Sequence, residues 1–197
     1  SALVDEIVLA VPEADLDYCA NELLRQYGLS KVKKVVRGGT ERQDSVRLAL
    51  EHVPERVEIV VVHDAVRPFL TETMIRDVVG AAEKHGAAIV ALPMRDTVKQ
   101  VGPDHVIQQT VDRRPLWLAQ TPQAFRRQWL KEAHHRAHAE GVQATDDAFL
   151  IEWLGHPVVV VEGTGENVKV TRPEDMVIGE AIWASHSACG KGAEHDK

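Results

Sequence analysis

The stretch VEIVVVHDAVRPFLTETMIRDVVGAAEKHGAAIVALPM, residues 57–94, is the part of this chain that most clearly indicates its fold class. It opens with a continuous apolar run at 57–62 and closes with another at 87–94, and both have the length of buried strands. Between them, Thr71 can cap a helix that places its apolar residues on one face and ends at Gly86. Two buried strands joined by a helix are the repeating unit of α/β proteins.

The same alternation of strands and helices continues on both sides of this unit. Further strands are expected at 4–11, 32–36 and 158–161, and helices at about 16–27, 40–50, 126–140, 146–154 and from about 173. Thr40 and Gln43 have the spacing of a capping box for the second of these helices. We therefore predict a single Rossmann-like domain over residues 1–184, with a mostly parallel sheet in three α/β/α layers, and a flexible tail over 185–197.

Residues 95–115 interrupt the alternation. Polar and β-branched residues alternate there around the turn Val101-Gly102-Pro103-Asp104, without a helical period. We predict a protruding β-hairpin arm, and an irregular surface loop is the alternative. An unpaired hairpin leaves strand edges exposed, and pairing with the same arm of a second copy would cover them. The arm therefore predicts a homodimer.

Composition excludes several classes of protein. With 44% hydrophobic and 27% charged residues among 197, the chain resembles one ordinary globular domain. Its 23 Lys and Arg against 30 Asp and Glu give a net charge of −7, which provides no general basic field for wrapping nucleic acid. No apolar run could span a bilayer, no signal-peptide pattern opens the chain, and the two cysteines lie far apart. We expect a cytoplasmic protein with neither a nucleic-acid nor a membrane partner.

Candidate site residues follow the predicted strands, at the edge of the sheet where such folds bind ligands. Asp64 ends the strand 57–63, and its carboxylate could hold Mg²⁺ or accept a substrate hydroxyl, or simply form a turn before Pro68. Arg67 could grip a phosphate or form a structural ion pair. Lys169, which precedes a helix with an acidic first turn, is a second phosphate candidate. Together these residues indicate a site for anionic phosphates.

Three other motifs leave alternatives open. The segment RGGTERQDS, 37–45, could bring backbone N–H groups close to a ligand at a helix N-terminus, but it lacks the phosphate-loop pattern and could be only a turn. Thr145-Asp146-Asp147 can cap a helix without any further function. His134, His135 and His138 include a pair with metal-ligand spacing, although a solvent-exposed helix face explains them more simply.

Seven strings in a fixed order resemble a known family. They are GGTERQDSV, VVVHDAVRP, PMRDTVK, TVDR, LAQTPQAF, TDDA and NVKVTRPED. Over residues 1 to about 184 the chain is similar to the 2-C-methyl-D-erythritol 4-phosphate cytidylyltransferases of the non-mevalonate isoprenoid pathway. The resemblance implies transfer of a cytidylyl group from CTP to a sugar-alcohol phosphate, with release of pyrophosphate and with Mg²⁺. Ribitol 5-phosphate cytidylyltransferases share most of these motifs and are the nearest alternative.

The resemblance also implies roles for individual residues. Nucleotide contacts fall on Gly39, Thr40, Ser45 and Ala65. Contacts with the acceptor phosphate fall on Arg67, Thr97, Arg113 and Thr145. The catalytic roles fall on Lys169 and Asp64, and Asp64 also meets the metal. In this family the arm reaches into a neighbouring subunit, which implies a homodimer with shared sites.

One part of the family's pattern is missing from this sequence. The family begins with a central strand and a glycine-rich loop, followed by a lysine, which cradle the triphosphate of CTP, and none of this precedes Ser1. Without that strand, its neighbours would be left with unpaired backbone groups. We therefore expect that the sequence lacks its beginning. A protein that truly started at Ser1 is expected to fold poorly and to have little or no transferase activity, and could be a non-catalytic nucleotide-binding remnant.

Overall fold

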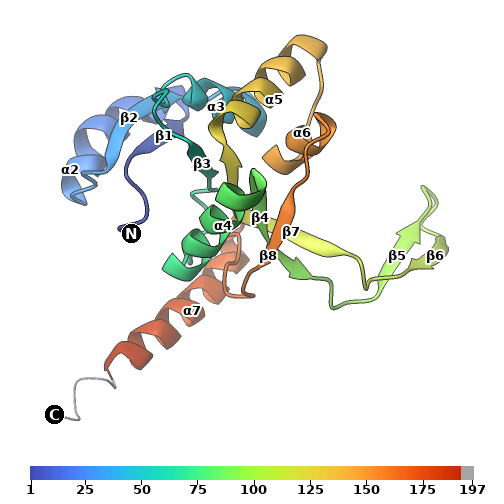
Figure 1. The fold of residues 1–197 in the computed structure, drawn as a ribbon. Coiled ribbons are helices and arrows are strands. Elements are labelled where there is room, and N and C mark those ends of the chain that lie inside the picture. The colour runs from blue at the N-terminus through green and yellow to red at the C-terminus, as the bar shows by residue number, and fades with distance from the viewer. Residues whose placement is uncertain (192–197) are drawn as a thin grey trace.

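The structure, a computed structural model, describes residues 1–191 of the chain (Figure 1). Its centre is a four-stranded sheet in the order β3–β7–β4–β8. These strands cover Ile59–Val62 (β3), Trp117–Arg126 (β7), Ala87–Pro93 (β4) and Val159–Glu162 (β8). β7 runs antiparallel to β3 and to β4, whereas β4 and β8 are parallel. The sheet is therefore mixed, with three strands pointing one way and one reversed strand between them.

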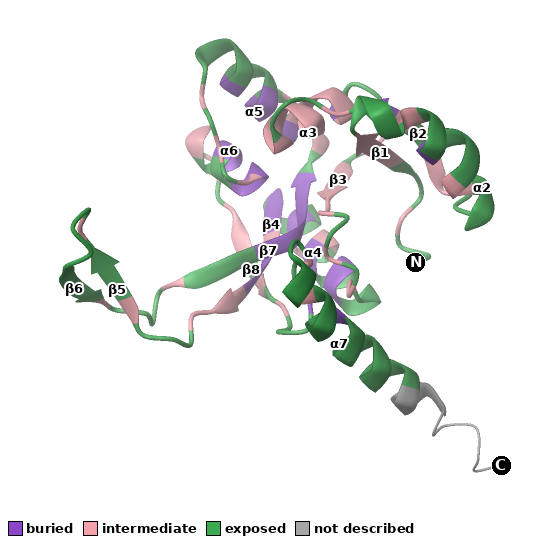
Figure 2. Cartoon of the chain, turned by 180° about the vertical axis from the view of Figure 1, so that it is seen from behind, coloured by how far each residue is buried: buried purple, intermediate pink, exposed green. Residues whose placement is uncertain are grey.

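Helices cover both faces of this sheet. They are α3 (Arg42–Leu50), α4 (Glu72–His85), α5 (Arg127–Glu140) and α6 (Asp147–Trp153). Because neighbouring strand residues point to opposite faces, Ala88 and Ala124 pack with Val78 of α4, whereas Ala87 and Phe125 pack with the other three helices. The buried strands lie between these two clusters (Figure 2). The predicted Rossmann-like α/β class is confirmed.

Strand β7 was not predicted from the sequence. Its middle carries Gln120, Thr121, Pro122 and Gln123, so it contains neither an apolar run nor a strict alternation. Gln120, Thr121 and Gln123 are buried, and hydrogen bonds to other parts of the chain satisfy their polar groups. Proline cannot donate to a ladder, and the pairing register with β4 shifts across this segment. The sheet is consequently less parallel than predicted.

A second sheet pairs β1 (Ile7–Val11) with β2 (Val32–Arg37) in parallel. The two sheets are separate, because among the described residues β1 pairs only with β2 and β3 only with β7. This division of the strands between two sheets was not part of the predicted fold class. The helix predicted between β1 and β2 is also irregular. It consists of a 3₁₀ turn at Glu13–Asp15, α1 (Leu16–Tyr18), a π-helical turn at Cys19–Leu23 and α2 (Leu24–Gln26).

The predicted arm is a two-stranded antiparallel hairpin that projects from the body (Figure 1). It is built from β5 (Val98–Val101) and β6 (Ile107–Val111). Val106 and Ile107 are both more than half exposed there. The regular pairing of β5 with β6 excludes the alternative of an irregular loop. The exposed apolar side chains leave a surface that a second copy could cover.

The last helix, α7 (Pro173–Lys191), extends away from the body. It begins at Pro173, as predicted, but it continues past residue 184, where the flexible tail was expected to begin. The tail's remaining residues, 192–197, lie outside the described part of the chain. Among the helices of residues 1–191, none combines the length and the apolar character needed to cross a bilayer.

Candidate active site

Asp64 joins two cations just beyond the carboxyl end of β3. Its Oδ1 accepts a hydrogen bond from Nε of Arg42 at 3.0 Å, and its Oδ2 lies 3.1 Å from Nζ of Lys169. Arg42 opens α3 and Lys169 lies between β8 and α7, so three distant segments meet at one carboxylate. The side chain of Asp64 is 14% exposed and that of Lys169 is 44% exposed. The ammonium group of Lys169 is thus held near the surface by a carboxylate that is mostly buried.

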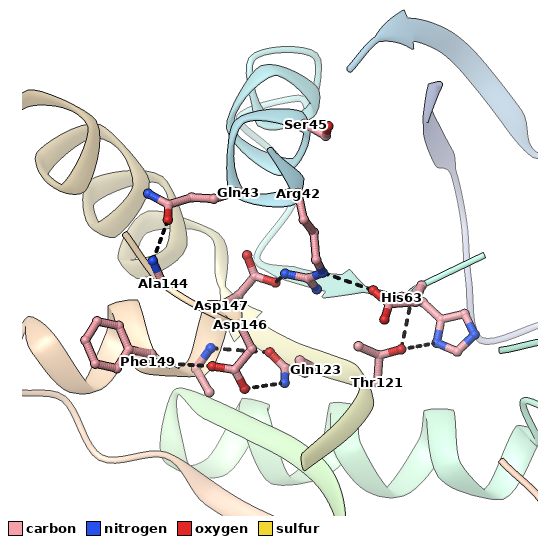
Figure 3. Close-up of polar contacts among 12 residues, drawn as sticks. Arg42, Gln43, Ser45, His63, Thr121, Gln123, Ala144, Asp146, Asp147 and Phe149 are labelled. Carbon is pink, nitrogen blue, oxygen red and sulfur yellow. Dashed lines mark hydrogen bonds and ion pairs between the residues drawn. The ribbon is translucent and has the colours of Figure 1, made fainter. Parts of the chain in front are cut away.

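A second carboxylate, Asp147, lies on the other side of Arg42 (Figure 3). Nη1 of Arg42 is 2.8 Å from Oδ2 of Asp147, and Nε2 of His134 lies 2.9 Å from its Oδ1. Asp147 and His134 are essentially inaccessible to solvent. A buried carboxylate needs a paired cation, and Arg42 provides one that is always charged. A continuous chain of polar contacts therefore runs from α5 through α6 and α3 to Lys169.

The ion pairs shift the pKa values of their members. Burial alone would raise the pKa of Asp64, but the bonds from Arg42 and Lys169 outweigh it and hold this pKa below its ordinary value of 3.8. Burial alone would lower the pKa of Arg42, but the charge of Asp147 and the bond to Asp64 raise it instead. Both groups are therefore charged at neutral pH, and the ion pair between them persists.

The backbone of Asp64 is fixed by His63 and Thr121 (Figure 3). Oγ1 of Thr121 accepts the N–H of Asp64 at 3.0 Å and lies 3.1 Å from Nδ1 of His63. Nε2 of His63 lies 3.0 Å from the carbonyl oxygen of Arg67. Since a carbonyl can only accept, Nε2 of the neutral ring carries the hydrogen, and Nδ1 accepts from the Thr121 hydroxyl. This network places the Asp64 carboxylate at the strand end.

Neutral His63 leads to a prediction about pH. Burial lowers the pKa of His63 below its ordinary value of 6.5. Below pH 6.5 the unfolded chain therefore binds more protons at His63 than the folded chain does. The free energy of unfolding that neutral His63 contributes is complete above pH 6.5 and should be lost as the pH falls through the folded-state pKa of His63. We expect an NMR titration to find His63 protonated only below pH 6.5, and His63→Gln to remove part of the loss of unfolding free energy on acidification. A measured pKa at or above 6.5 would contradict this.

Asn167 anchors the loop that carries Lys169. It is fully buried, and its Nδ2 donates to the carbonyl of Thr121 at 2.9 Å and to Oε1 of Gln120 at 3.1 Å. Nη1 of Arg67 donates to the carbonyl of Asn167 at 2.7 Å. Arg67 thus binds the backbone of this loop, and no ion pair joins it to the residues that the structure describes. The loop is tied to β7 and to the segment after β3, which brings Lys169 to Asp64.

The two glycines before α3 allow a tight approach of backbone and helix. The N–H of Gly39 donates to Oγ of Ser45 at 3.0 Å, and this hydroxyl donates to the carbonyl of Glu41 at 3.2 Å. A Cβ atom at Gly39 would lie 2.2 Å from the Cβ of Asp44, closer than carbon atoms can come. The loop therefore requires glycine at this position, and Thr40 beside it is exposed.

The predicted capping box at this helix was wrong. The N-cap residue is Glu41, and no side chain caps the helix. Gln43 instead reaches the loop before α6, where it donates to the carbonyl of Val142 at 3.0 Å and accepts from the N–H of Ala144 at 2.8 Å (Figure 3). A glutamine amide can satisfy a backbone donor and acceptor together, and this long-range pair replaced the local bond to Thr40.

A second glutamine holds the other side of the same loop. Gln123 of β7 donates to Oδ2 of Asp146 at 2.9 Å and accepts from the N–H of Ala148 at 3.3 Å. Asp146 also caps α6 by accepting from the N–H of Phe149 at 3.0 Å. Capping therefore explains Asp146, as the sequence suggested, and the exposed Thr145 is carried on a firmly held loop.

A family model described as IspD, 2-C-methyl-D-erythritol 4-phosphate cytidylyltransferase, matches residues 1–185 of this chain. The chain belongs to the 2-C-methyl-D-erythritol 4-phosphate cytidylyltransferase family. The resemblance seen in the sequence is thereby confirmed over almost the whole described chain.

Individual relatives of the cytidylyltransferase family agree with this assignment. Cytidylyltransferases of this name from Syntrophus aciditrophicus and Alkaliphilus metalliredigens are 49% and 45% identical, over 91% of this chain and 77% and 74% of their own lengths. The crystal structure of the Thermus thermophilus enzyme superimposes with a TM-score of 0.78 at 36% identity, covering 91% of this chain and 82% of that one. A structure from Anaerococcus prevotii gives a TM-score of 0.82 at 31% identity, covering 91% and 79%.

The structure brings together some of the residues suggested by the cytidylyltransferase resemblance. Asp64 and Lys169 are in direct contact, and Gly39 bonds to Ser45 at the start of the helix that carries Arg42. Other residues lie elsewhere. Ala65 faces a hollow of about 430 Å³ that it lines with Phe69, Val170 and Trp183 among others. Thr97 and Arg113 are exposed at the base of the arm, where Arg113 donates to the backbone of Arg95. No contact within residues 1–191 joins them to Asp64 or Lys169.

Sequence reasoning missed two charged residues of this site. Arg42 was considered only as part of the segment 37–45, and Asp147 only as part of the helix cap at 145–147. His134 was expected on a wet helix face, yet it is buried against Asp147. A buried carboxylate, a buried histidine and a half-buried arginine on three separate helices have no local signal in the sequence. The only available clue was the position of Arg42 directly after the glycine pair.

Proposed function

We propose that this protein transfers a cytidylyl group from CTP to 2-C-methyl-D-erythritol 4-phosphate, which gives 4-diphosphocytidyl-2-C-methyl-D-erythritol and pyrophosphate. The observation that carries the proposal is the Asp64–Lys169 ion pair at the strand ends of a chain that matches this family over residues 1–185. Transfer to ribitol 5-phosphate is not favoured, because the similar proteins carry the methylerythritol name.

Lys169 would stabilise charge during the transfer. An oxygen of the acceptor phosphate attacks the α-phosphorus of CTP, and pyrophosphate leaves in line with it. Negative charge accumulates on the α-phosphate, and a fixed ammonium stabilises it without any covalent enzyme intermediate. Lys169 suits this role because its Nζ is held by Asp64 while its side chain remains 44% exposed. Asp64 supports this reaction by fixing the ammonium group.

Magnesium is part of the proposal, with Asp64 as its protein ligand. Among the residues that the structure describes, no group of three His, Cys, Asp or Glu side chains could form a metal cage. Mg²⁺ on a nucleotide commonly takes only one or two carboxylates and fills its shell with phosphate oxygens and water. Each Asp64 oxygen pairs with one cation and keeps a further lone pair, so the residue fits this limited role. When bound, the ion would neutralise phosphate charge.

The nucleotide would lie beside the loop before α3. Backbone groups at Gly39 and Thr40, and the hydroxyl of Ser45, are the contacts proposed for cytosine and ribose. This loop is exposed and lies on the same helix start as Arg42, which reaches Asp64. Ala65, which directly follows Asp64, is the remaining contact proposed for the nucleotide, and in the structure it lines the hollow beside Phe69 and Trp183.

The tight packing of Gly39 leads to a second prediction. Gly39→Ala should weaken CTP binding by about 10-fold, the loss expected from about one hydrogen bond, because relieving the clash with Asp44 displaces the backbone groups proposed to contact the nucleotide. Isothermal titration with CTP measures this. Gly80→Ala on α4 is the matched control, because a Cβ atom there meets nothing within 4 Å. Equal CTP affinity in both variants would show that the Gly39 loop does not hold the nucleotide.

The acceptor site would be shared between two subunits. Arg67 and Thr145 belong to the body of the chain, whereas Thr97 lies just before β5 and Arg113 just after β6, at the base of the arm. An exposed arm that presents Val101, Val106 and Ile107 to solvent is suited to pairing with a second copy. We propose a homodimer in which the arm of one subunit completes the phosphate site of the other. A cytoplasmic location, expected from the sequence, also stays a prediction.

The proposed activity is tested by measuring pyrophosphate release. We expect release only when CTP, Mg²⁺ and methylerythritol phosphate are all present, and a much lower rate with ribitol 5-phosphate. Faster release with ribitol 5-phosphate would reverse the choice of acceptor. A folded protein that binds CTP but releases no pyrophosphate with either acceptor would contradict the proposal and favour a nucleotide-binding remnant.

A further inference from the structure

Arg42 contacts two carboxylates with two different nitrogens. Its Nε donates to Oδ1 of Asp64 at 3.0 Å, and its Nη1 lies 2.8 Å from Oδ2 of Asp147. Arg42 belongs to α3, Asp64 lies just after β3, and Asp147 is the first residue of α6. The guanidinium of Arg42 therefore connects three elements of the fold. A guanidinium is rigid and flat, and it therefore fixes the position of both carboxylates relative to α3.

The Asp147 side of this contact is firmly anchored. Asp147 is 1% exposed, and its other oxygen lies 2.9 Å from Nε2 of the buried His134 on α5. Gln123 and the cap formed by Asp146 hold the backbone at the same point. Arg42 is consequently fixed at one end by a buried group, and its Nε presents a fixed donor to Asp64.

At its other end, Arg42 holds the carboxylate that contacts Lys169. Asp64 is the only described partner of the Lys169 ammonium group, at 3.1 Å through Oδ2. Because Arg42 occupies Oδ1, the carboxylate cannot rotate to offer both oxygens to Lys169. The position of the Lys169 ammonium group therefore depends on the hydrogen bond from Arg42 to Asp64.

We propose that Arg42 is a positioning residue that acts on the transfer reaction through Asp64, by setting where Lys169 holds its ammonium group. This inference rests on the proposed function. Arg42 touches neither substrate in this account, and its effect on the reaction passes entirely through the Asp64–Lys169 pair.

Arg42→Lys is the variant that tests the positioning. Lysine keeps the positive charge, but its single nitrogen cannot replace both Nε, which contacts Asp64, and Nη1, which contacts Asp147. We expect kcat to fall between about 10- and 100-fold, the scale for a misplaced catalytic group, with little change in the KM for CTP. Arg47→Lys is the matched control on the same helix. Within residues 1–191 Arg47 forms an ion pair with Asp44 alone, at 3.8 Å, and the variant should keep the wild-type kcat.

A double-mutant cycle separates positioning from a general structural role. If Arg42 acts through Lys169, adding Arg42→Lys to Lys169→Ala should lower kcat by less than about 3-fold further, because the group to be positioned is already gone. A structural defect would instead multiply the two losses. Independent, multiplied losses, or a wild-type kcat in Arg42→Lys alone, would overturn the inference.

A second measurement requires no turnover. In protein labelled with ¹³C-lysine, the ε-methylene NMR signal of Lys169 is identified by its loss in Lys169→Ala. This signal should shift in Arg42→Lys and stay in place in Arg47→Lys, whereas an unchanged signal in both would overturn the positioning. If wild-type protein releases no pyrophosphate, the proposed function fails, and the NMR signal still decides whether Arg42 positions Lys169.

Discussion

Replacing Lys169 by alanine should lower kcat/KM at least about 100-fold, the scale seen when a fixed charge stabiliser is removed from a transition state. The physical reason is the geometry of Nζ, which Asp64 holds at 3.1 Å while the side chain remains accessible to the phosphates. The loss should appear mainly in kcat, because the charge on the α-phosphate grows during the reaction. Steady-state rates of pyrophosphate release measure it.

Two further variants make the Lys169 prediction specific. Lys169→Arg should restore activity only in part, because a planar fork cannot replace a compact ammonium at the same point. Lys131→Ala is the matched control, since Lys131 also pairs with a carboxylate, Glu51 at 3.3 Å, but lies on α5. It should keep the wild-type rate. A Lys169→Ala protein with a nearly unchanged rate would remove Lys169 from the mechanism.

Mixing two inactive variants should restore activity if the sites are shared between subunits. Arg113→Ala should be inactive like Lys169→Ala, because Arg113, on the arm, would bind the phosphate in the partner's site. In a mixed dimer one site collects both changes and the other has neither. Random exchange of equal amounts makes half of the dimers mixed, so roughly a quarter of the wild-type activity should return.

The control for this experiment is the extent of subunit exchange, followed with two differently tagged variants. Arg113→Ala mixed with wild type should show that the variant folds and exchanges. No recovery after verified exchange would mean that each subunit supplies its own arginine, or that Arg113 serves only the interface.

Much of the fold could be predicted from the sequence because its core strands are apolar. The runs around β3 and β4, and the helix between Thr71 and Gly86, have strong local signals, and the structure places a Thr71 cap and a left-handed Gly86 there. β7 had no such signal, because its buried polar side chains are satisfied by distant partners. The hydrogen-bond partners of Gln123, for example, are Asp146 and Ala148, which lie more than 20 residues further along the chain.

The candidate site shows the same limit. Asp64 and Lys169 could be proposed because they follow strands, where α/β folds place their ligands. The contact between Asp64 and Arg42 could not be proposed, because it depends on Asp147 and His134, which belong to helices whose relative placement no local pattern describes. The roles proposed for Thr97 and Arg113 would need a second subunit, because within residues 1–191 neither side chain bonds to Asp64 or Lys169.

The central claim, direct transfer of the cytidylyl group to the acceptor phosphate, is tested most directly with an isotope. Methylerythritol phosphate carrying ¹⁸O in its phosphate oxygens is incubated with CTP, Mg²⁺ and the protein, and both products are analysed by mass spectrometry. The account predicts 4-diphosphocytidyl-2-C-methyl-D-erythritol that retains every labelled oxygen, together with unlabelled pyrophosphate. Label in the pyrophosphate, loss of label from the nucleotide product, or release of free CMP in its place would contradict it.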